Sequence, residues 1–174
     1  MATSAAAAAA GAKFRDLSDA FSRSACYCLN EHPSHPFGNL FIGDHTLQLK
    51  SDADEQLILH IEFQDAVKLH SINIVAPVGE SAPRVLKLFA NRSSLGFSDA
   101  GDIEPTQTIE LTDDDLDPSK EVELRFVKFQ RVQSITLFVE ENNGAEETVI
   151  SSLKLIGERI AGTNMNELKK VSDE

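Results

Sequence analysis

Four residues in one short stretch carry side chains that bind transition metals: Cys26, Cys28, His32 and His35. Zinc sites do combine two cysteines with two histidines, but their paired cysteines are usually separated by about two to four residues. Here a single residue separates them, and Pro33 interrupts the set. Ligands this close together would strain a tetrahedral cage, so the sequence predicts no metal and no cofactor.

The same cysteines offer a second chemistry, thiol–disulfide exchange. Redox dithiols generally use Cys-x-x-Cys at the start of a helix, whereas cysteines one residue apart rarely reach disulfide geometry without strain. Two cysteines do not make an extracellular disulfide framework, so a reducing compartment fits better. A redox role for Cys26 and Cys28 stays open as an alternative.

Two acidic runs, Asp52–Glu55 and Asp113–Asp115, could supply oxygen ligands to calcium. An EF-hand loop needs Gly at its sixth position and Glu at its twelfth. Counted from Asp52 these positions hold Leu57 and Phe63, and counted from Asp113 they hold Pro118 and Leu124. Both runs are therefore interpreted as solvated acidic loops.

Nucleophilic catalysis has one partial signal, the sequence GFSDA at Gly96–Ala100. It lacks the second glycine of a nucleophile elbow, and no strand-to-helix turn is apparent around it. His60 and His70 lie within expected strands and are interpreted as side chains on an exposed or half-buried face. No triad order or phosphate loop stands out, so we expect no catalytic residue and no enzyme activity.

The size, charge and aromatic content of the chain limit the kinds of partner that it could bind. A chain of 174 residues is expected to form one domain that needs no metal or disulfide to fold. The net charge of −12 and the pI near 4.8 disfavour binding to nucleic acid and to anionic membranes. No apolar run could span a bilayer.

Binding of a glycan or other small molecule is an alternative function. A sugar site usually needs an aromatic platform, however, and Tyr27 is the only Tyr or Trp. We expect a monomer.

The element around which the chain is organised is Ser51–Phe63. Its apolar residues Leu57, Leu59, Ile61 and Phe63 alternate with others, which predicts a strand with one buried face. A short connection at Gln64–Ala66 is expected to lead into a second strand, Val67–Val75. The apolar phase of that second strand changes, which predicts a bulge near Ser71 or a strand buried on both faces.

Further apolar segments separated by turn residues predict a series of strands: Arg84–Asn91, Thr106–Leu111, Glu121–Gln130, Ser134–Glu140 and Thr148–Ile156. Phe14, Leu17 and Phe21 have the spacing of a short amphipathic helix. Residues 1–12 are expected to be a flexible Ala-rich tail, and Thr163–Val171 a terminal helical turn or a docking tail. This order predicts an all-β sandwich or jelly roll with a short N-terminal helix.

Six segments resemble the PITH domain, the module named for proteasome-interacting thioredoxin proteins. They occur in family order across about residues 14–171: Cys28–Glu31, Ser51–Leu57, Val67–Leu69, Glu104–Gln107, Phe126–Gln130 and Thr163–Asn166. The resemblance implies a galactose-binding-like jelly roll over residues 13–174. It also implies association with the regulatory particle of the proteasome in the cytoplasm and nucleus.

The chain departs from the thioredoxin-like members of that family. It has no Trp and no Cys-x-x-Cys, so it resembles the stand-alone members, and the disulfide-reductase activity is not expected to carry over. A non-catalytic interaction module is the resulting hypothesis. Exposure and charge suggest a contact surface formed by six residues: Asp52, Asp54, Glu55, Asn164, Lys169 and Lys170. The alternative for Ser51–Leu57 is that its acids cap backbone N–H groups and touch no partner.

Overall fold

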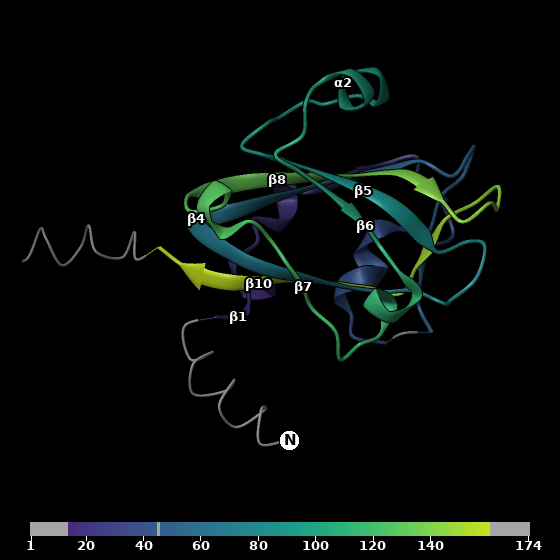
Figure 1. Ribbon diagram of the computed structural model, residues 1–174, viewed down its shortest axis with the longest axis horizontal. Helices are drawn as coiled ribbons and strands as arrows, with labels where there is room; N and C mark the ends of the chain where they lie inside the picture. The colour runs from purple at the N-terminus through teal and green to yellow at the C-terminus, as the bar shows by residue number, and fades with distance from the viewer. Residues whose placement is uncertain (1–13, 45, 161–174) are drawn as a thin grey trace, which may run out of the picture.

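One long strand, β4 (Leu57–Val75), connects the two layers of the protein (Figure 1). The structure is a computed structural model and describes residues 14–44 and 46–160. The predicted connection at Gln64–Ala66 is wrong, because the chain continues as strand through these residues. The register of β4 with β8 (Val132–Asn142) instead jumps between Glu62 and Val67, and this bulge carries β4 from one layer into the other.

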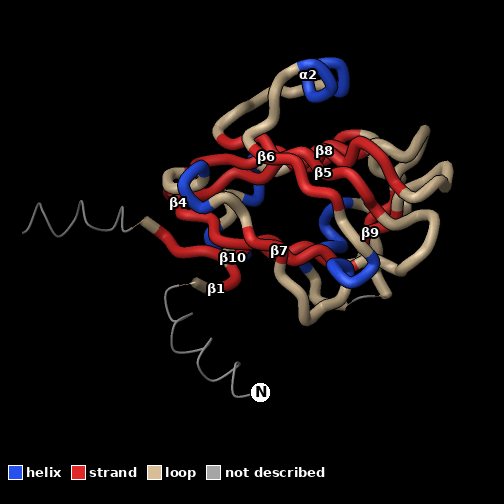
Figure 2. Tube along the Cα trace, in the orientation of Figure 1, coloured by secondary structure: helices blue, strands red, loops and turns tan. Residues whose placement is uncertain are grey.

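Most of the other strands extend the two halves of β4 into two antiparallel layers, drawn in red in Figure 2. One layer contains the first half of β4 with β2 (Tyr27–Leu29), β8, β5 (Pro83–Ala90) and β6 (Gln107–Glu110). The other contains the second half with β1 (Arg15–Asp16), β10 (Ser152–Arg159) and β7 (Val122–Glu123). A small separate sheet pairs β3 (Leu49–Lys50) with β9 (Val149–Ile150).

The core between the layers follows the alternation seen in the sequence. All four residues predicted to face inward on the first half of β4 are buried. On the second half Ser71 pairs with Ile156 and Leu69 pairs with Gly157, so His70 is an extra residue in β4. This is the bulge predicted near Ser71, and it explains why the apolar phase of the strand changes there.

The first half of β4 is buried on its outer face as well, which the prediction of a single buried face missed. Ile58 belongs to a second apolar cluster with Phe89, Leu95, Ala100 and Phe138. Leu95 and Ala100 come from the segment around α2 (Phe97–Asp102), which lies over this layer in Figure 1. The α2 segment therefore covers a sheet face that would otherwise be open.

Three predicted elements differ in the structure. The N-terminal helix is reduced to a single 3-10 turn, η1 (Ser18–Ala20), which follows β1. Glu121–Gln130 is not a strand, since it contains only the two residues of β7 followed by the 3-10 turn η5 (Phe126–Lys128). Thr148–Ile156 divides into β9 and β10. The strands expected at Arg84–Asn91, Thr106–Leu111 and Ser134–Glu140 are confirmed as β5, β6 and β8.

Further 3-10 turns occur at η2 (Arg23–Ala25), η3 (Phe37–Phe41) and η4 (Asp113–Leu116). None of the helices in the described ranges is long and apolar enough to cross a membrane. The predicted tail at 1–12 and the segment Thr163–Val171 lie outside the described residues.

Candidate functional site

Asn30 connects two of the segments that resemble the PITH domain, Cys28–Glu31 and Ser51–Leu57, which are far apart in the sequence. It follows β2 and has a left-handed backbone with φ of 71°, a conformation that asparagine tolerates better than most residues. Its Nδ2 donates to Asp54 Oδ1 at 3.0 Å and to the Gln56 carbonyl at 2.8 Å. Its Oδ1 accepts from the backbone N–H of Ala53 at 3.0 Å. The acidic loop before β4 is thus held by Asn30 on one side.

Thr148, which precedes β9, holds the same loop from the other side. Its N–H donates to Ser51 Oγ at 2.8 Å, and its hydroxyl donates to the Glu55 carbonyl at 2.6 Å. Ser51 and Thr148 are both buried. Asn142 fixes the next turn by donating to the carbonyls of Ala145 and Glu147, each at 3.0 Å. Buried, satisfied hydrogen bonds of this kind make the loops rigid.

These loops meet around a surface depression at one end of the sandwich. Its walls come from the β3–β4, β4–β5 and β8–β9 connections and consist of Asp52, Ala53, Glu80, Gly144, Ala145, Glu146 and Glu147. The Ala145 N–H donates to the Glu80 carbonyl at 3.1 Å, which ties the second and third connections together. Four of the seven lining residues are acidic and none is basic, so the depression has a negative potential that attracts cationic groups.

The structure separates the residues predicted for an interaction surface. Asp52 is exposed and lines the acidic depression, whereas Asp54 is exposed but accepts hydrogen bonds from Asn30 and from the Gln56 N–H. Glu55 is half-buried. The other three predicted residues lie outside the described part of the chain: Asn164, Lys169 and Lys170.

Sequence reasoning did not include Glu80, Glu146 or Glu147 in the site. The Asn-Asn-Gly turn signal followed by two glutamates marks an acidic loop, which could have been noted. That this loop meets Glu80 and Asp52 depends on the strand order, which the sequence pattern did not provide.

The metal-like set around Cys26 was predicted to hold no metal. In the described ranges no three His, Cys, Asp or Glu side chains lie together in a way that could hold a metal ion. His32 Nδ1 accepts the Ser34 N–H at 3.0 Å, and the rings of His32 and His35 lie 5.4 Å apart. Cys26 and Cys28 instead pack against the core between the layers.

The environment of the two thiols disfavours the thiolate form. Burial raises the pKa of Cys26, although the Glu62 N–H donates to its Sγ at 3.4 Å. Burial, with a contribution from the negative charge of Glu31, raises the pKa of Cys28 far above its ordinary value. A nucleophilic cysteine needs a lowered pKa. The redox alternative stays a prediction, and the environment of the sulfurs argues against it.

His60 takes part in a carboxylate–imidazole–hydroxyl array like that of hydrolases. Its Nδ1 lies 2.9 Å from Thr136 Oγ1, and its Nε2 lies 3.1 Å from Glu62 Oε2. His60 and Thr136 are each only 1% exposed, and the Tyr27 ring stacks on the imidazole at 4.8 Å. The Thr136 hydroxyl is closed to solvent, and the array links β2, β4 and β8.

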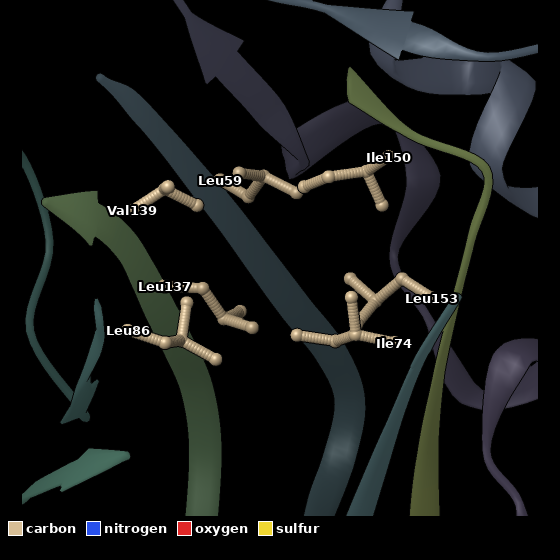
Figure 3. Close-up of a pocket in the computed structure, with 7 residues that line it drawn as sticks. All are labelled: Leu59, Ile74, Leu86, Leu137, Val139, Ile150 and Leu153. Carbon is tan, nitrogen blue, oxygen red and sulfur yellow. The ribbon is translucent and has the colours of Figure 1, made fainter. Parts of the chain in front are cut away.

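The void between the two layers is too small for a ligand. Figure 3 shows a void lined by seven apolar side chains from both layers: Leu59, Ile74, Leu86, Leu137, Val139, Ile150 and Leu153. Its volume is about 10 Å³, which is at most the space of one water molecule.

Residues 7–173 match the PITH domain. The chain belongs to the PITH domain family. It is 42% identical over 149 residues to Thioredoxin-like protein 1 of Schizosaccharomyces pombe, covering 83% of this chain and 51% of that protein. It is 32% identical to PITH domain-containing protein 1 of Homo sapiens, covering 66% of this chain and 54% of that protein. This PITH chain therefore spans about half the length of these curated relatives.

Solved structures confirm the β-sandwich fold of this PITH domain. A family 32 carbohydrate-binding module of Clostridium perfringens NanJ, in complex with galactose, aligns with a TM-score of 0.57 at 12% identity, over 76% of this chain and 92% of the module. Domains of ZmpB from the same organism align with a TM-score of 0.64 at 11% identity, over 91% of this chain and 16% of that chain. The identities are low, so this likeness concerns the fold alone.

Proposed function

We propose that this PITH domain is a non-catalytic protein-interaction module that associates with the regulatory particle of the proteasome in the cytoplasm and nucleus. The observation that carries the proposal is the match to the PITH domain over residues 7–173. Relatives such as PITH domain-containing protein 1 are named for the domain they contain rather than for a reaction, which supports the absence of catalysis. The closed His60 array and the raised pKa values of the thiols point in the same direction.

The proposed contact surface is the acidic depression with Asp52, Glu80, Glu146 and Glu147. Rigid loops reduce the ordering entropy that binding costs, and Asn30 and Thr148 hold these loops in place. The negative charge favours a partner that presents Lys and Arg side chains. Asn164, Lys169 and Lys170 are proposed as a second contact.

Co-sedimentation of the purified protein with intact 26S proteasomes tests this proposal. Reversing the charge of the depression with Glu146→Lys and Glu147→Lys should weaken binding about tenfold or more and reduce its salt dependence. The matched control is Asp113→Lys with Asp114→Lys, which makes the same change in net charge at an exposed acidic pair outside the depression. This control should bind like the unchanged protein.

A third variant ends before Lys169 and tests the second contact. Loss of binding on this truncation alone would place the contact on the C-terminal segment rather than on the depression. Equal loss in the two charge-reversed variants would mean that only net charge matters and would refute the assigned surface. No co-sedimentation at low salt would refute the proposed function itself.

A further inference from the structure

A groove on the outer face of the second layer shares no residue with the acidic depression. One wall is the start of the described chain at β1, and the other is the connection from β6 to β7. The volume of the groove is about 210 Å³, below the roughly 300–1,000 Å³ of sites for drug-sized molecules. The groove therefore suits a ligand of only a few heavy atoms.

Hydrogen bonds to β4 hold the second wall in place. Asn73 Nδ2 donates to the Asp117 carbonyl at 3.2 Å and to the Lys120 carbonyl. Ser71 Oγ donates to Glu121 Oε1 at 3.0 Å. Asn73 and Ser71 are 3% and 0% exposed, and buried, satisfied bonds of this kind make a wall rigid. The shape of the groove is thus set by the fold before any ligand binds.

The side-chain oxygen of Asn73 lacks a partner at the floor of this groove. It makes no hydrogen bond within residues 14–44 and 46–160. The unpaired side-chain atoms that are buried in these ranges belong instead to His70 and Arg159, so the Asn73 oxygen is open to the groove that the residue lines. An amide oxygen accepts through two lone pairs. The groove therefore offers a fixed acceptor for a ligand N–H.

Charged side chains of both signs lie around this acceptor. Glu121 lines the groove on the rigid wall, and Arg15 lines it on the other. Lys154 is directly opposite Asn73 in the pairing of β10 with β4, where Cβ atoms are about 4.5–5.5 Å apart. The ion pairs of the described residues involve none of these three. An ammonium group fits the carboxylate and the amide oxygen, and a carboxylate fits the two cations.

Apolar surface completes the lining. Ile156 is buried, at 8% exposed, but belongs to neither apolar cluster, because it lies on the outer face of its layer and forms part of the groove. The Phe14 ring is half-buried and Pro118 is exposed, and they line the groove from opposite walls. An uncharged, apolar group of a ligand would be covered by these three side chains.

We propose that the groove binds a free α-amino acid with an apolar side chain. Its ammonium group donates to Asn73 Oδ1 and Glu121, and its carboxylate accepts from Lys154 and Arg15. A single carbon joins the two charged groups of an α-amino acid, which matches the position of Lys154 opposite Asn73. This site is additional to the proposed proteasome contact and does not depend on it.

Titration of the ¹⁵N-labelled full chain with L-leucine, followed by ¹H–¹⁵N NMR spectra, tests the proposal. The amide signals of Asn73 and Lys154 should shift and saturate. Two matched probes each lack one charged group: isopentylamine has no carboxylate, and isocaproate has no ammonium. Each should bind at least about fivefold more weakly than leucine, because it loses the charge-assisted hydrogen bonds at one end of the site.

Charge-neutralising variants locate the site. Lys154→Gln and Glu121→Gln should each weaken leucine binding about two- to fivefold, the range for exposed ion pairs, and Gln at position 121 keeps an oxygen for the Ser71 hydroxyl. The matched controls are Arg131→Gln and Glu123→Gln, which remove one exposed charge of each sign outside the groove. Both controls should bind leucine like the unchanged protein.

Three results would overturn the proposal. The first is a spectrum that leucine does not shift in a saturable way. The second is equal binding of leucine and either matched probe, since the site would then not recognise both charged groups. The third is equal weakening by the groove variants and the controls, which would mean that leucine responds only to net charge. The titration uses the protein alone, so its outcome is independent of proteasome binding.

Discussion

Gly157 is the residue on which the junction of β10 and β4 depends most directly. It pairs with Leu69 where the extra residue His70 shifts the register. A Cβ built on Gly157 would lie against the Lys68 carbonyl oxygen, far inside contact distance, with the carbonyl carbon at 2.9 Å and Leu69 Cα at 3.1 Å. These are backbone atoms of a buried strand, so they cannot rotate away as a side chain would. Gly157→Ala must separate the two strands.

The cost of that separation can be estimated. Overpacking in a core costs typically about 1–3 kcal/mol, and more where the neighbour cannot move, so we expect Gly157→Ala to lower the free energy of unfolding by about 3 kcal/mol or more. For a chain of this size this lowers the melting temperature by about 6–12 °C. Urea unfolding followed by far-UV circular dichroism is the appropriate assay, because the chain has no Trp.

Gly38→Ala is the matched control. A Cβ at Gly38 meets nothing within 4 Å, and its φ is not in the left-handed region, so the change should stay within about 0.5 kcal/mol. A Gly157→Ala protein that unfolds within that margin of the unchanged protein would refute the close approach of the strands at the bulge.

Two further predictions concern the loop anchor and the thiols. Asn30→Gly keeps the left-handed backbone but removes the four hydrogen bonds of the side chain, so it should lower the free energy of unfolding in urea by about 1–3 kcal/mol. Asn30→Ala should cost about 1 kcal/mol more through backbone strain, and equal stability of the two variants would contradict this. Because burial raises the pKa values of Cys26 and Cys28 above the unfolded value of about 8.5, the unfolded state loses these protons first as pH rises. The free energy of unfolding should therefore fall above about pH 8.5 relative to a Cys26→Ala, Cys28→Ala protein. Alkylation of the folded thiols at pH 8 should be slow. Rapid alkylation of the folded protein would support the redox alternative.

The sequence predicts those features of the fold that depend on neighbouring residues, and not those that depend on pairing with distant strands. The inward face of Leu57–Phe63 and the phase change near Ser71 follow from side-chain alternation, and both are present in the structure. The continuity of β4 through Gln64 and Asp65 could not be predicted in this way. Exposed polar residues are found both in turns and in bulges, and the register of the partner strand β8 decides between them.

The segment Glu121–Gln130 illustrates the opposite error. Val122, Leu124 and Phe126 alternate as in a strand, yet within this segment strand pairing with β4 is limited to Val122 and Glu123. A strand needs a free edge to pair with, and whether one is available depends on distant parts of the chain. The acidic depression also depends on distant parts of the chain. Each of its acidic loops can be recognised in the sequence, but the strand order brings them together.

The acidic loop before β4 is predicted to serve either a partner or the fold, and the structure shows a role in the fold for Asp54. Asp54 Oδ1 accepts from Asn30 and from the Gln56 N–H, each at 3.0 Å. Asp54→Ala should therefore lower the free energy of unfolding by about 1 kcal/mol or more, while Asp54→Asn keeps an acceptor oxygen and should cost less. The carboxylate of Asp52 lines the depression, so Asp52→Ala should leave the urea midpoint unchanged.

Proteasome co-sedimentation of the same variants completes the comparison. If the proposed surface is correct, Asp52→Ala weakens binding without loss of stability, because a charge at the rim of an interface changes attraction rather than folding. Asp54→Asn removes the same charge a short distance away and should change binding less, since Asp54 does not line the depression. The reverse pattern, with stability lost at Asp52 and binding lost at Asp54, would mean that the two roles within this loop had been exchanged.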